Sequence, residues 1–404
     1  MKKVGIITHY YLSNNYGGNL QAYALAEFIN RLDGYCAEQI CFDFLHKNEG
    51  DDEKDKESQK NSNFEINRPI YSLKNYLHIC KKRIKNRHYF IELKNKAVNR
   101  IWKKRFASRT KATKIFNQTI IPHSKCVYDE KNIYDSNSEY DIFITGSDQV
   151  WAGCSNAFTL GFVRGKSKLS YAASLGITNI PSKNRRFLSH QLKDYSAISV
   201  RSKDDKRIVS EISDKEVEMV VDPVFLFDKN EWNLVAAKVR RYSEKFVFCY
   251  FLGDNKNQKK LAAKFAKLNK FKVVNIAHFA DNTNRVVFND MFFGDYRPYD
   301  ISPADFIALI RDAEYIFTDS FHALVFSVIY HKQFFAFERI SKYGDMNARL
   351  LSLLEMIGLN QRFCDNVNCN LEYINSIDDI NYNYCDHILD KEIQHSKEFL
   401  CNNI

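Results

Sequence analysis

The sequence predicts an α/β fold of two Rossmann-like domains facing across a cleft, with a basic helical insert in the first domain. The chain opens with a strand, a glycine-bearing loop, a helix and a second strand within residues 1–44. Alternating apolar runs and helical patterns resume near residue 140 and restart near Asp228. At 404 residues the chain is also long for a single core, which favours two domains.

The first domain is expected to cover residues 1–228. It begins with the apolar strand "KKVGIITHY", and apolar positions from Leu20 to Leu32 then recur at helical spacing until Gly34 ends the helix. A charged stretch, 46–68, and a basic helical segment form the insert, about 46–115. Later strands run into the polar segments "TGSDQVW", "YAASLG", "SVRSKDD" and "VVDPVFLF".

The second domain is expected to cover residues 229–375. Its strands are "KFVFCYFLG", "FKVVNIAH", "EYIF" and "KQFFAFE", and its helices include 257–269 and 347–357. A helical tail, residues 376–404, follows. One possible arrangement places this tail back against the first domain. Two successive α/β halves place ligands beyond the carboxyl ends of the strands.

Composition narrows the class of protein. Hydrophobic residues make up 45% and charged residues 27%, which is ordinary for a soluble globular protein. No apolar run approaches the roughly 20 residues that span a bilayer, and the N-terminal run is too short for a signal peptide, so a cytoplasmic protein is expected. The ten cysteines are scattered, with no C-x-x-C pair, and even Cys364 and Cys369 are five positions apart, which favours reduced thiols over disulfides or a metal site.

The insert is strongly basic. Fifteen Lys and Arg residues and one acidic residue, Glu92, lie between Lys74 and Lys114, and apolar residues interleave at helical spacing. The pattern indicates amphipathic helices that are either a solvated insert or a face for an anionic membrane surface or a phosphate-rich acceptor. Only charge would argue for nucleic acid, because the aromatic residues form no stacking pattern, and none is expected.

Small and polar residues follow several predicted strands. In "NNYGGNLQAYAL", Gly17 and Gly18 permit a tight turn and a close approach to a ligand, although an ordinary β–α turn would look the same. The loop is neither G-x-G-x-x-G nor a P-loop, so NAD and ATP are not indicated. In "TGSDQVW", Trp151 either stacks on a sugar or, as the safer interpretation, fills the core. Arg201 is either a surface residue or a clamp for a carboxylate or phosphate.

The stretch "FTDSFHALVFSVIY" joins polar residues to a buried helix. Ser320 or Asp319 could cap this helix, which would place His322 in its first turn. The helix field there favours a neutral imidazole, which can take or relay a proton beside an anion. A histidine that simply packs in the core is the competing interpretation.

Six segments in order resemble the polysaccharide pyruvyl transferase family: "NNYGGNLQAYAL", "YDIFITGSDQVW", "YAASLG", "ISVRSKDD", "VVDPVFLF" and "EYIFTDSFHALVFSVIYHKQF". The segment "NARLLSLLEMIGLNQR" is similar to the closing helix of that family. The resemblance runs from Met1 to about Arg362 and leaves out the insert and the tail. The family often has Gly and Asn where this chain has Ala323 and Ala152, which could alter the shape of the pocket.

The resemblance implies a fold similar to GT-B glycosyltransferases and transfer of a pyruvyl group from phosphoenolpyruvate to two hydroxyls of a sugar. The product would be a cyclic ketal on a surface-polysaccharide precursor, often lipid-linked, with release of phosphate. His322 would be the acid/base residue and Arg201 would bind the donor's anionic groups. Neither a cofactor nor a metal is implied. The expected substrate-binding residues are Asn15, Tyr16, Gly17, Gly18, Asn19, Gln21, Gly146, Ser147, Asp148, Trp151, Ser174, Thr318, Asp319, Ser320, Arg339 and Arg349.

Two alternatives remain open. One is a GT-B-like glycosyltransferase that uses a nucleotide sugar, and the absence of an evident D-x-D motif at a strand end weighs against a metal-dependent form. The other is a non-catalytic glycan- or membrane-binding protein that uses the basic insert at the inner face of a membrane.

Overall fold

A computed structural model describes residues 1–44, 100, 104–177, 180–253, 255–280, 285–286, 292–339, 347–365, 367 and 369–404. Most of the predicted insert, 46–115, therefore lies outside the described residues. The end of the insert is described: residues 104–119 form a helix.

The first sheet has five parallel strands in the order β3-β2-β1-β4-β5. Buried apolar residues of β1 form its centre, and Val4 pairs with Ala37 on one side and Ile142 on the other. A short parallel pair, β6 and β7, continues from its edge through the bridge between Leu169 and Ala197. The elements are β1 (Lys2–Ile7), α1 (Tyr16–Asn30), β2 (Tyr35–Phe42), β3 (His123–Tyr128), η1 (Ile133–Ser138), β4 (Ile142–Thr145), β5 (Ser167–Ser170), α3 (Ser182–Leu192), β6 (Ile198–Val200), α4 (Lys203–Ser210), β7 (Val217–Met219) and η2 (Pro223–Leu226).

The second sheet is also parallel, with the order β14-β13-β12-β8-β9. Every residue of β8 is buried, as expected for a central strand covered on both faces. The elements are α5 (Lys229–Val235), β8 (Phe246–Tyr250), α6 (Lys256–Leu268), β9 (Lys272–Asn275), β10 (Phe279–Ala280), β11 (Arg285–Val286), α7 (Pro303–Asp312), β12 (Tyr315–Thr318), α8 (Phe321–Ile329), β13 (Gln333–Phe337), α9 (Ala348–Met356), η4 (Asn360–Arg362), β14 (Phe363–Cys364), α10 (Leu371–Ser376) and α11 (Tyr382–Asn403). Two parallel sheets with helices confirm the predicted two-domain α/β fold.

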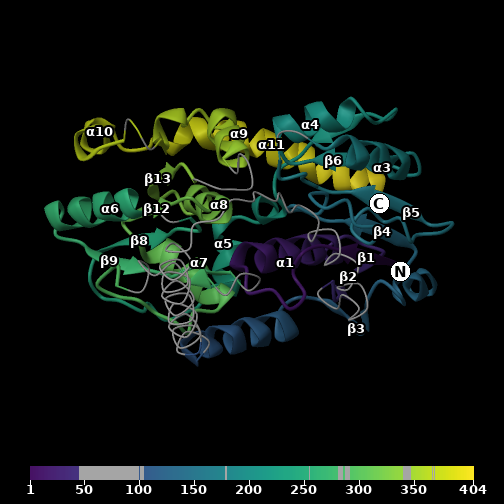
Figure 1. Ribbon diagram of the computed structural model, residues 1–404, viewed down its shortest axis with the longest axis horizontal. Helices are drawn as coiled ribbons and strands as arrows, with labels where there is room; N and C mark the ends of the chain where they lie inside the picture. Colours follow the sequence, from purple (N-terminus) through teal and green to yellow (C-terminus); the bar gives the residue numbers. More distant parts are fainter. Residues whose placement is uncertain are drawn as a thin grey trace, which may run out of the picture.

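Helix α1 lies between the two sheets and contacts both domains (Figure 1). Its first residue, Tyr16, is completely buried, and its ring stacks on Phe306 of α7 with centroids 4.9 Å apart. The Tyr16 hydroxyl donates a hydrogen bond to the carbonyl of Ile301 at 3.1 Å. One apolar cluster therefore runs from α1 through α7 and α8, so the two domains share part of their core.

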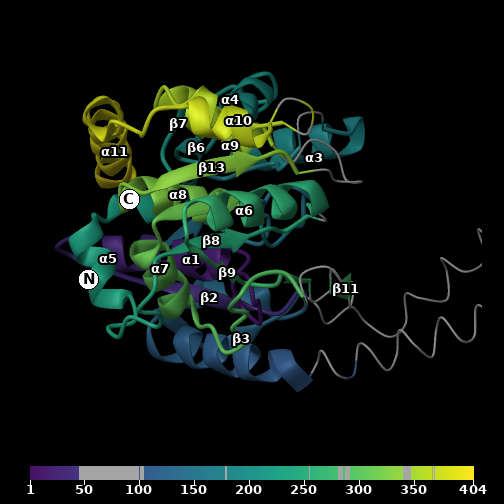
Figure 2. The ribbon, with the colours of Figure 1, turned by 90° about the vertical axis from the view of Figure 1, so that its left-hand side faces the viewer.

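The C-terminal helix α11 crosses from the second domain to the first (Figures 1 and 2). Tyr382 at its start packs in the shared cluster, whereas Phe399 and Leu400 near its end pack against the apolar residues of β1 and β4. The Ser396 hydroxyl accepts a hydrogen bond from the amide of Val221 at 2.9 Å. The tail is thus part of the core of the first domain.

The expectation that all cysteines are reduced thiols is wrong for one pair. Cys364 ends β14, and the chain turns back so that Cys369 forms a disulfide with it, with the Cα atoms 5.1 Å apart. The turn is the reason, since two cysteines separated by five residues meet only when the intervening chain folds back on itself. In the described part of the chain, no helix is long and apolar enough to cross a membrane.

We expect Tyr16→Ala to lower the free energy of unfolding by about 3–5 kcal/mol, because it leaves a cavity between the domains. Tyr16→Phe removes only the hydrogen bond to Ile301 and should cost about 1 kcal/mol. Leu234→Ala, at a side chain that is 74% exposed, is the control and should change stability by less than about 0.5 kcal/mol. Urea denaturation followed by fluorescence measures all three, and equal losses for Tyr16→Ala and Leu234→Ala would contradict the interdomain role.

Candidate active site

Two helix N-termini, one from each domain, meet at the centre of the candidate site. The side chain of Asn15 accepts a hydrogen bond from the amide of Gly18 at 3.3 Å and caps α1. Ser320 caps α8 and accepts from the amide of Ala323 at 3.5 Å. Gly17 touches His322 so closely that a Cβ there would overlap the imidazole ring and lie 2.8 Å from the Cβ of His322. Glycine is therefore required at this position for contact between the helices.

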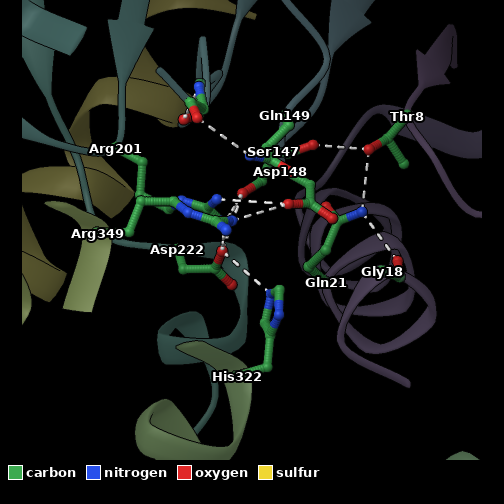
Figure 3. Close-up of polar contacts among 12 residues, drawn as sticks. Thr8, Gly18, Gln21, Ser147, Asp148, Gln149, Arg201, Asp222, His322 and Arg349 are labelled. Carbon is green, nitrogen blue, oxygen red and sulfur yellow. Dashed lines mark hydrogen bonds and ion pairs between the residues drawn. The ribbon is translucent and has the colours of Figure 1, made fainter. Parts of the chain in front are cut away.

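His322 lies in the first turn of α8, as the sequence predicted, and its side chain is 8% exposed. Its Nε2 is 3.5 Å from Oδ2 of Asp222, which lies just before η2 in the first domain (Figure 3). Among the described residues, Nε2 makes no hydrogen bond at that distance or any other. The carboxylate thus lies next to Nε2 and orients the ring.

The same carboxylate holds Arg201, which follows β6. Oδ2 of Asp222 is 2.5 Å from Nη1 of Arg201 and accepts a hydrogen bond from the Ser147 hydroxyl at 2.9 Å. Burial would raise the pKa of Asp222, but the contact with His322 and the charge of Arg201 outweigh burial and hold that pKa well below its usual range. Asp222 is therefore a permanent carboxylate that fixes Arg201 and His322 together.

Asp148 forms the second carboxylate of the site and joins the two domains. Its Oδ1 is 3.5 Å from Nη2 of Arg201 and 3.3 Å from Nη1 of Arg349, which lies on α9 (Figure 3). Burial opposes ionisation, yet the charges of Arg201 and Arg349 prevail and lower the pKa of Asp148. Asp148 has φ of 72°, a strained backbone conformation for a non-glycine residue of the kind that clusters at functional sites.

Three guanidiniums and three carboxylates lie close together at this point. Burial and the neighbouring guanidiniums of Arg201 and Arg339 lower the pKa of Arg349 to about 10, so Arg349 remains charged at neutral pH at a cost. Arg339, after β13, binds Asp319, with Nε 3.4 Å from Oδ2 and Nη2 donating to the backbone carbonyl at 2.7 Å. Clustered guanidiniums of this kind favour a ligand with a carboxylate or phosphate group.

Several predicted substrate-binding residues instead make contacts that shape the loops. Asp319 accepts hydrogen bonds from the amides of Leu252 and Gly253 at 2.6 and 2.9 Å. The Thr318 hydroxyl donates to the carbonyl of Tyr250 at 2.5 Å. These hydrogen bonds join the end of β12 to the end of β8 and to the loop that follows it.

A second network supports the loop after β1. Gln21 donates to the Thr8 hydroxyl at 3.0 Å and to the carbonyl of Gly18 at 2.9 Å, and the Thr8 hydroxyl donates to the carbonyl of Ser147 at 2.7 Å (Figure 3). Gly146 lies next to Ile6, Thr8 and Leu25, so a Cβ there would be 3.4–3.5 Å from their side chains. The loops after β1 and β4 are consequently fixed to each other before any ligand arrives.

Four other predicted residues lie in the packing around the site. Trp151 is completely buried in the core beside Tyr195, where its ring offers no face to a sugar. Tyr16 is the interdomain contact described above. The buried residues Asn19 and Ser174 make backbone contacts: Asn19 donates to the carbonyl of Ser13, and the Ser174 hydroxyl accepts from the amide of Gly176.

A family model for polysaccharide pyruvyl transferase matches residues 15–341. The chain belongs to the polysaccharide pyruvyl transferase family. The matched range includes His322, Arg201 and Asp222, whereas Arg349 lies beyond its end. A search of curated proteins found no match for the sequence.

Solved structures similar to this chain include sugar-nucleotide epimerases and glycosyltransferases. A putative UDP-N-acetylglucosamine 2-epimerase from Listeria monocytogenes is 10% identical, with 96% of this chain and 91% of that chain covered and a TM-score of 0.49. The UDP-GlcNAc 2-epimerase from Neisseria meningitidis is 13% identical, with full coverage of both chains and a TM-score of 0.41. A glycosyltransferase from Rickettsia africae ESF-5 is 13% identical, with 100% and 94% covered and a TM-score of 0.41.

In this member of the pyruvyl transferase family, sequence reasoning missed two residues of the site. Asp222 lies at a strand end in the segment "VVDPVFLF". The Asp-Pro pair in that segment was the sequence signal that could have identified Asp222 as a site residue. His9 follows β1 and packs 4.0 Å from the ring of Phe158. Burial lowers the pKa of His9, although the charge of Asp148 opposes this effect. Within the described residues, no group of three or more His, Cys, Asp or Glu side chains is placed to hold a metal ion.

Asp222→Asn is expected to lower the free energy of unfolding at pH 7 by about 3–5 kcal/mol, because Arg201 is left buried without its counter-charge. The folded pKa of Asp222 is depressed, so its contribution is present above the unfolded pKa of about 4 and decreases as the pH falls below it. Urea denaturation between pH 7 and pH 2 should show the gap between wild type and variant closing at the acidic end.

The surface pair of Arg241 and Asp300 provides the matched control. Asp300→Asn should cost no more than about 1 kcal/mol, since Asp300 is largely exposed. A loss for Asp222→Asn as small as that of the control, or one that is independent of pH, would show that the buried pair does not hold the site.

Proposed function

We propose that this protein transfers the pyruvyl group of phosphoenolpyruvate to a sugar of a surface-polysaccharide precursor as a cyclic ketal, with release of phosphate. The observation that carries the proposal is the position of His322. Among the described residues its Nε2 makes no hydrogen bond, and it lies 3.5 Å from Oδ2 of Asp222, the same oxygen that binds Arg201. Membership of the pyruvyl transferase family supports the reaction class.

The chemistry requires an anion site and a proton carrier. Phosphoenolpyruvate has a carboxylate and a phosphate, which suit the guanidiniums of Arg201 and Arg349. One proton is added to the methylene carbon of the enol, and the first sugar hydroxyl bonds to the neighbouring carbon and loses its proton. The carbon–oxygen bond to phosphate then breaks, and the second hydroxyl takes the place of phosphate and loses its proton.

The proton balance of the reaction calls for a group that both accepts and donates protons. Two hydroxyl protons are lost, one is added to the methyl carbon of the product, and one leaves with phosphate. A single group that accepts and returns protons at one atom can therefore serve both halves of the reaction. We assign that atom to Nε2 of His322 and assign its orientation to Asp222.

His322→Asn should lower kcat for phosphate release from phosphoenolpyruvate and acceptor by about 10²–10⁴-fold, the usual contribution of a general acid/base group. The fold should survive, because asparagine fits the space next to Gly17. The control is His395→Asn, at an exposed histidine that pairs with Glu218. Phosphate release close to that of the wild type in His322→Asn would overturn the assignment.

Arg349→Gln tests the donor site more cleanly than a change at Arg201, whose loss would also leave Asp222 buried and unpaired. We expect phosphoenolpyruvate to raise the melting temperature of the wild type and to bind Arg349→Gln about 30-fold more weakly, equivalent to about 2 kcal/mol for a charged hydrogen bond. Arg207→Gln, at a largely exposed arginine, carries the same charge change and should bind normally.

The same melting assay tests the competing functions. A shift with a nucleotide sugar, but none with phosphoenolpyruvate, would favour a glycosyltransferase. No shift with either ligand would favour a non-catalytic glycan- or membrane-binding protein. Membrane contact through the insert stays a prediction, because most of that segment lies outside the described residues.

A further inference from the structure

Phe321 is the first residue of α8, and its ring lies among the charged side chains of the candidate site. Ser320 caps this helix, so Phe321 stands in the first turn directly before His322. The Phe321 side chain is buried and belongs to the apolar cluster that the two domains share. An aromatic ring therefore packs at the domain boundary in the same place as the ionised groups.

The ring contacts two guanidiniums that come from different domains. The guanidinium carbon of Arg201, which follows β6, lies over the Phe321 ring at 4.5 Å from its centroid. The guanidinium carbon of Arg349, on α9, lies over the same ring at 5.9 Å. Both contacts fall within the roughly 6 Å at which a cation is attracted to an aromatic face. One ring therefore binds both of the arginines that we assign to the donor.

The two guanidiniums also share one carboxylate oxygen. Oδ1 of Asp148 is 3.5 Å from Nη2 of Arg201 and 3.3 Å from Nη1 of Arg349. Like charges at this separation repel each other, and an aromatic face attracts both guanidiniums while it carries no net charge. A neutral ring leaves the positive charge of the arginines available to an anionic ligand, whereas a further carboxylate in its place would compete with that ligand.

A small cavity adjoins the ring. Its volume is about 20 Å³, and its lining includes Phe321, Arg201, Arg349 and two apolar side chains of α9, Leu353 and Met356. A cavity of this size has room for about one water molecule, so the guanidiniums are closely confined here. A side chain smaller than phenylalanine at position 321 would enlarge the cavity and give both guanidiniums room to move.

We propose that Phe321 is a positioning residue of the donor site, whose ring fixes the guanidiniums of Arg201 and Arg349 in the arrangement that binds the anionic groups of the donor. The part of these guanidiniums in donor binding rests on the proposed function, whereas their placement by the ring does not. Because the ring carries no group that ionises or exchanges protons, its effect on donor affinity is exerted through the two arginines.

Phosphoenolpyruvate is the probe, titrated calorimetrically into the full-length protein. Phe321→Leu keeps an apolar side chain but removes the ring, and it should weaken binding about 10-fold because both cation–ring contacts are lost. Phe321→Tyr keeps the ring and should bind within about 3-fold of the wild type, since both contacts remain.

A second buried ring over an arginine provides the matched control. Phe335 of β13 lies 5.0 Å from the guanidinium carbon of Arg362, outside the candidate site. Phe335→Leu removes the same kind of contact and also truncates a core side chain, so it should lower stability. Its affinity for phosphoenolpyruvate should stay within about 2-fold of the wild type, because the two sites are independent.

A nuclear magnetic resonance signal tests the placement of the guanidiniums without a ligand. The ring current of an aromatic side chain moves the signals of nuclei over its face upfield. The Nε proton of Arg201 should therefore resonate upfield of that of Arg207, which is largely exposed. The displacement should disappear in Phe321→Leu and persist in Phe321→Tyr. The wild-type signal is informative even where a variant folds poorly.

The possible results separate the positioning role from the proposed function. Normal affinity in Phe321→Leu, equal losses in Phe321→Leu and Phe335→Leu, or a loss in Phe321→Tyr as large as that in Phe321→Leu would each overturn the proposal. An Arg201 signal without displacement in the wild type would overturn it whether or not phosphoenolpyruvate binds. A displaced signal that depends on the ring, in a protein that does not bind phosphoenolpyruvate, would keep the placement of the arginines and reject the donor site.

Discussion

The buried ion pair between Arg201 and Asp222 is the constraint on which the rest of the site depends. One oxygen, Oδ2 of Asp222, meets Nη1 of Arg201 at 2.5 Å, the Ser147 hydroxyl at 2.9 Å and Nε2 of His322 at 3.5 Å. These partners come from three separate segments of the chain. Removal of two charges from water is unfavourable unless their geometry is fixed, so the pair requires the surrounding loops to hold one arrangement. The side chains of Arg201, Asp222 and His322 are consequently held together in one arrangement.

The start of α1 links the packing between the domains to the geometry of the site. Tyr16, the first residue of α1, stacks on Phe306, and the next residue, Gly17, touches His322. A shift of α1 that loosened the aromatic contact would therefore also move the wall against which the imidazole rests. The stability of the shared core thus sets the position of the histidine.

The sequence predicted the two α/β halves because buried parallel strands and amphipathic helices have strong local patterns. It also placed His322, Arg201 and the loop around Gly17 at strand ends, where parallel sheets gather ligand-binding residues. It could not show which polar residues face a ligand. Asp319 and Asp148 each follow a strand in the sequence. In the structure, however, Asp319 accepts hydrogen bonds from the amides of Leu252 and Gly253, and this difference depends on the tertiary fold. Asp222 was missed for the same reason, since its partners are distant in sequence.

Asp148 shows how such a concentration of charge is tolerated. It joins Arg201 of the first domain to Arg349 of the second, and its strained backbone places a single carboxylate between them. Burial, and then repulsion by the neighbouring guanidiniums of Arg201 and Arg339, lower the pKa of Arg349 to about 10. A ligand with its own negative charge would relieve that repulsion across the domain boundary. Such a ligand would contact charged residues of both domains, so its binding would also stabilise their contact.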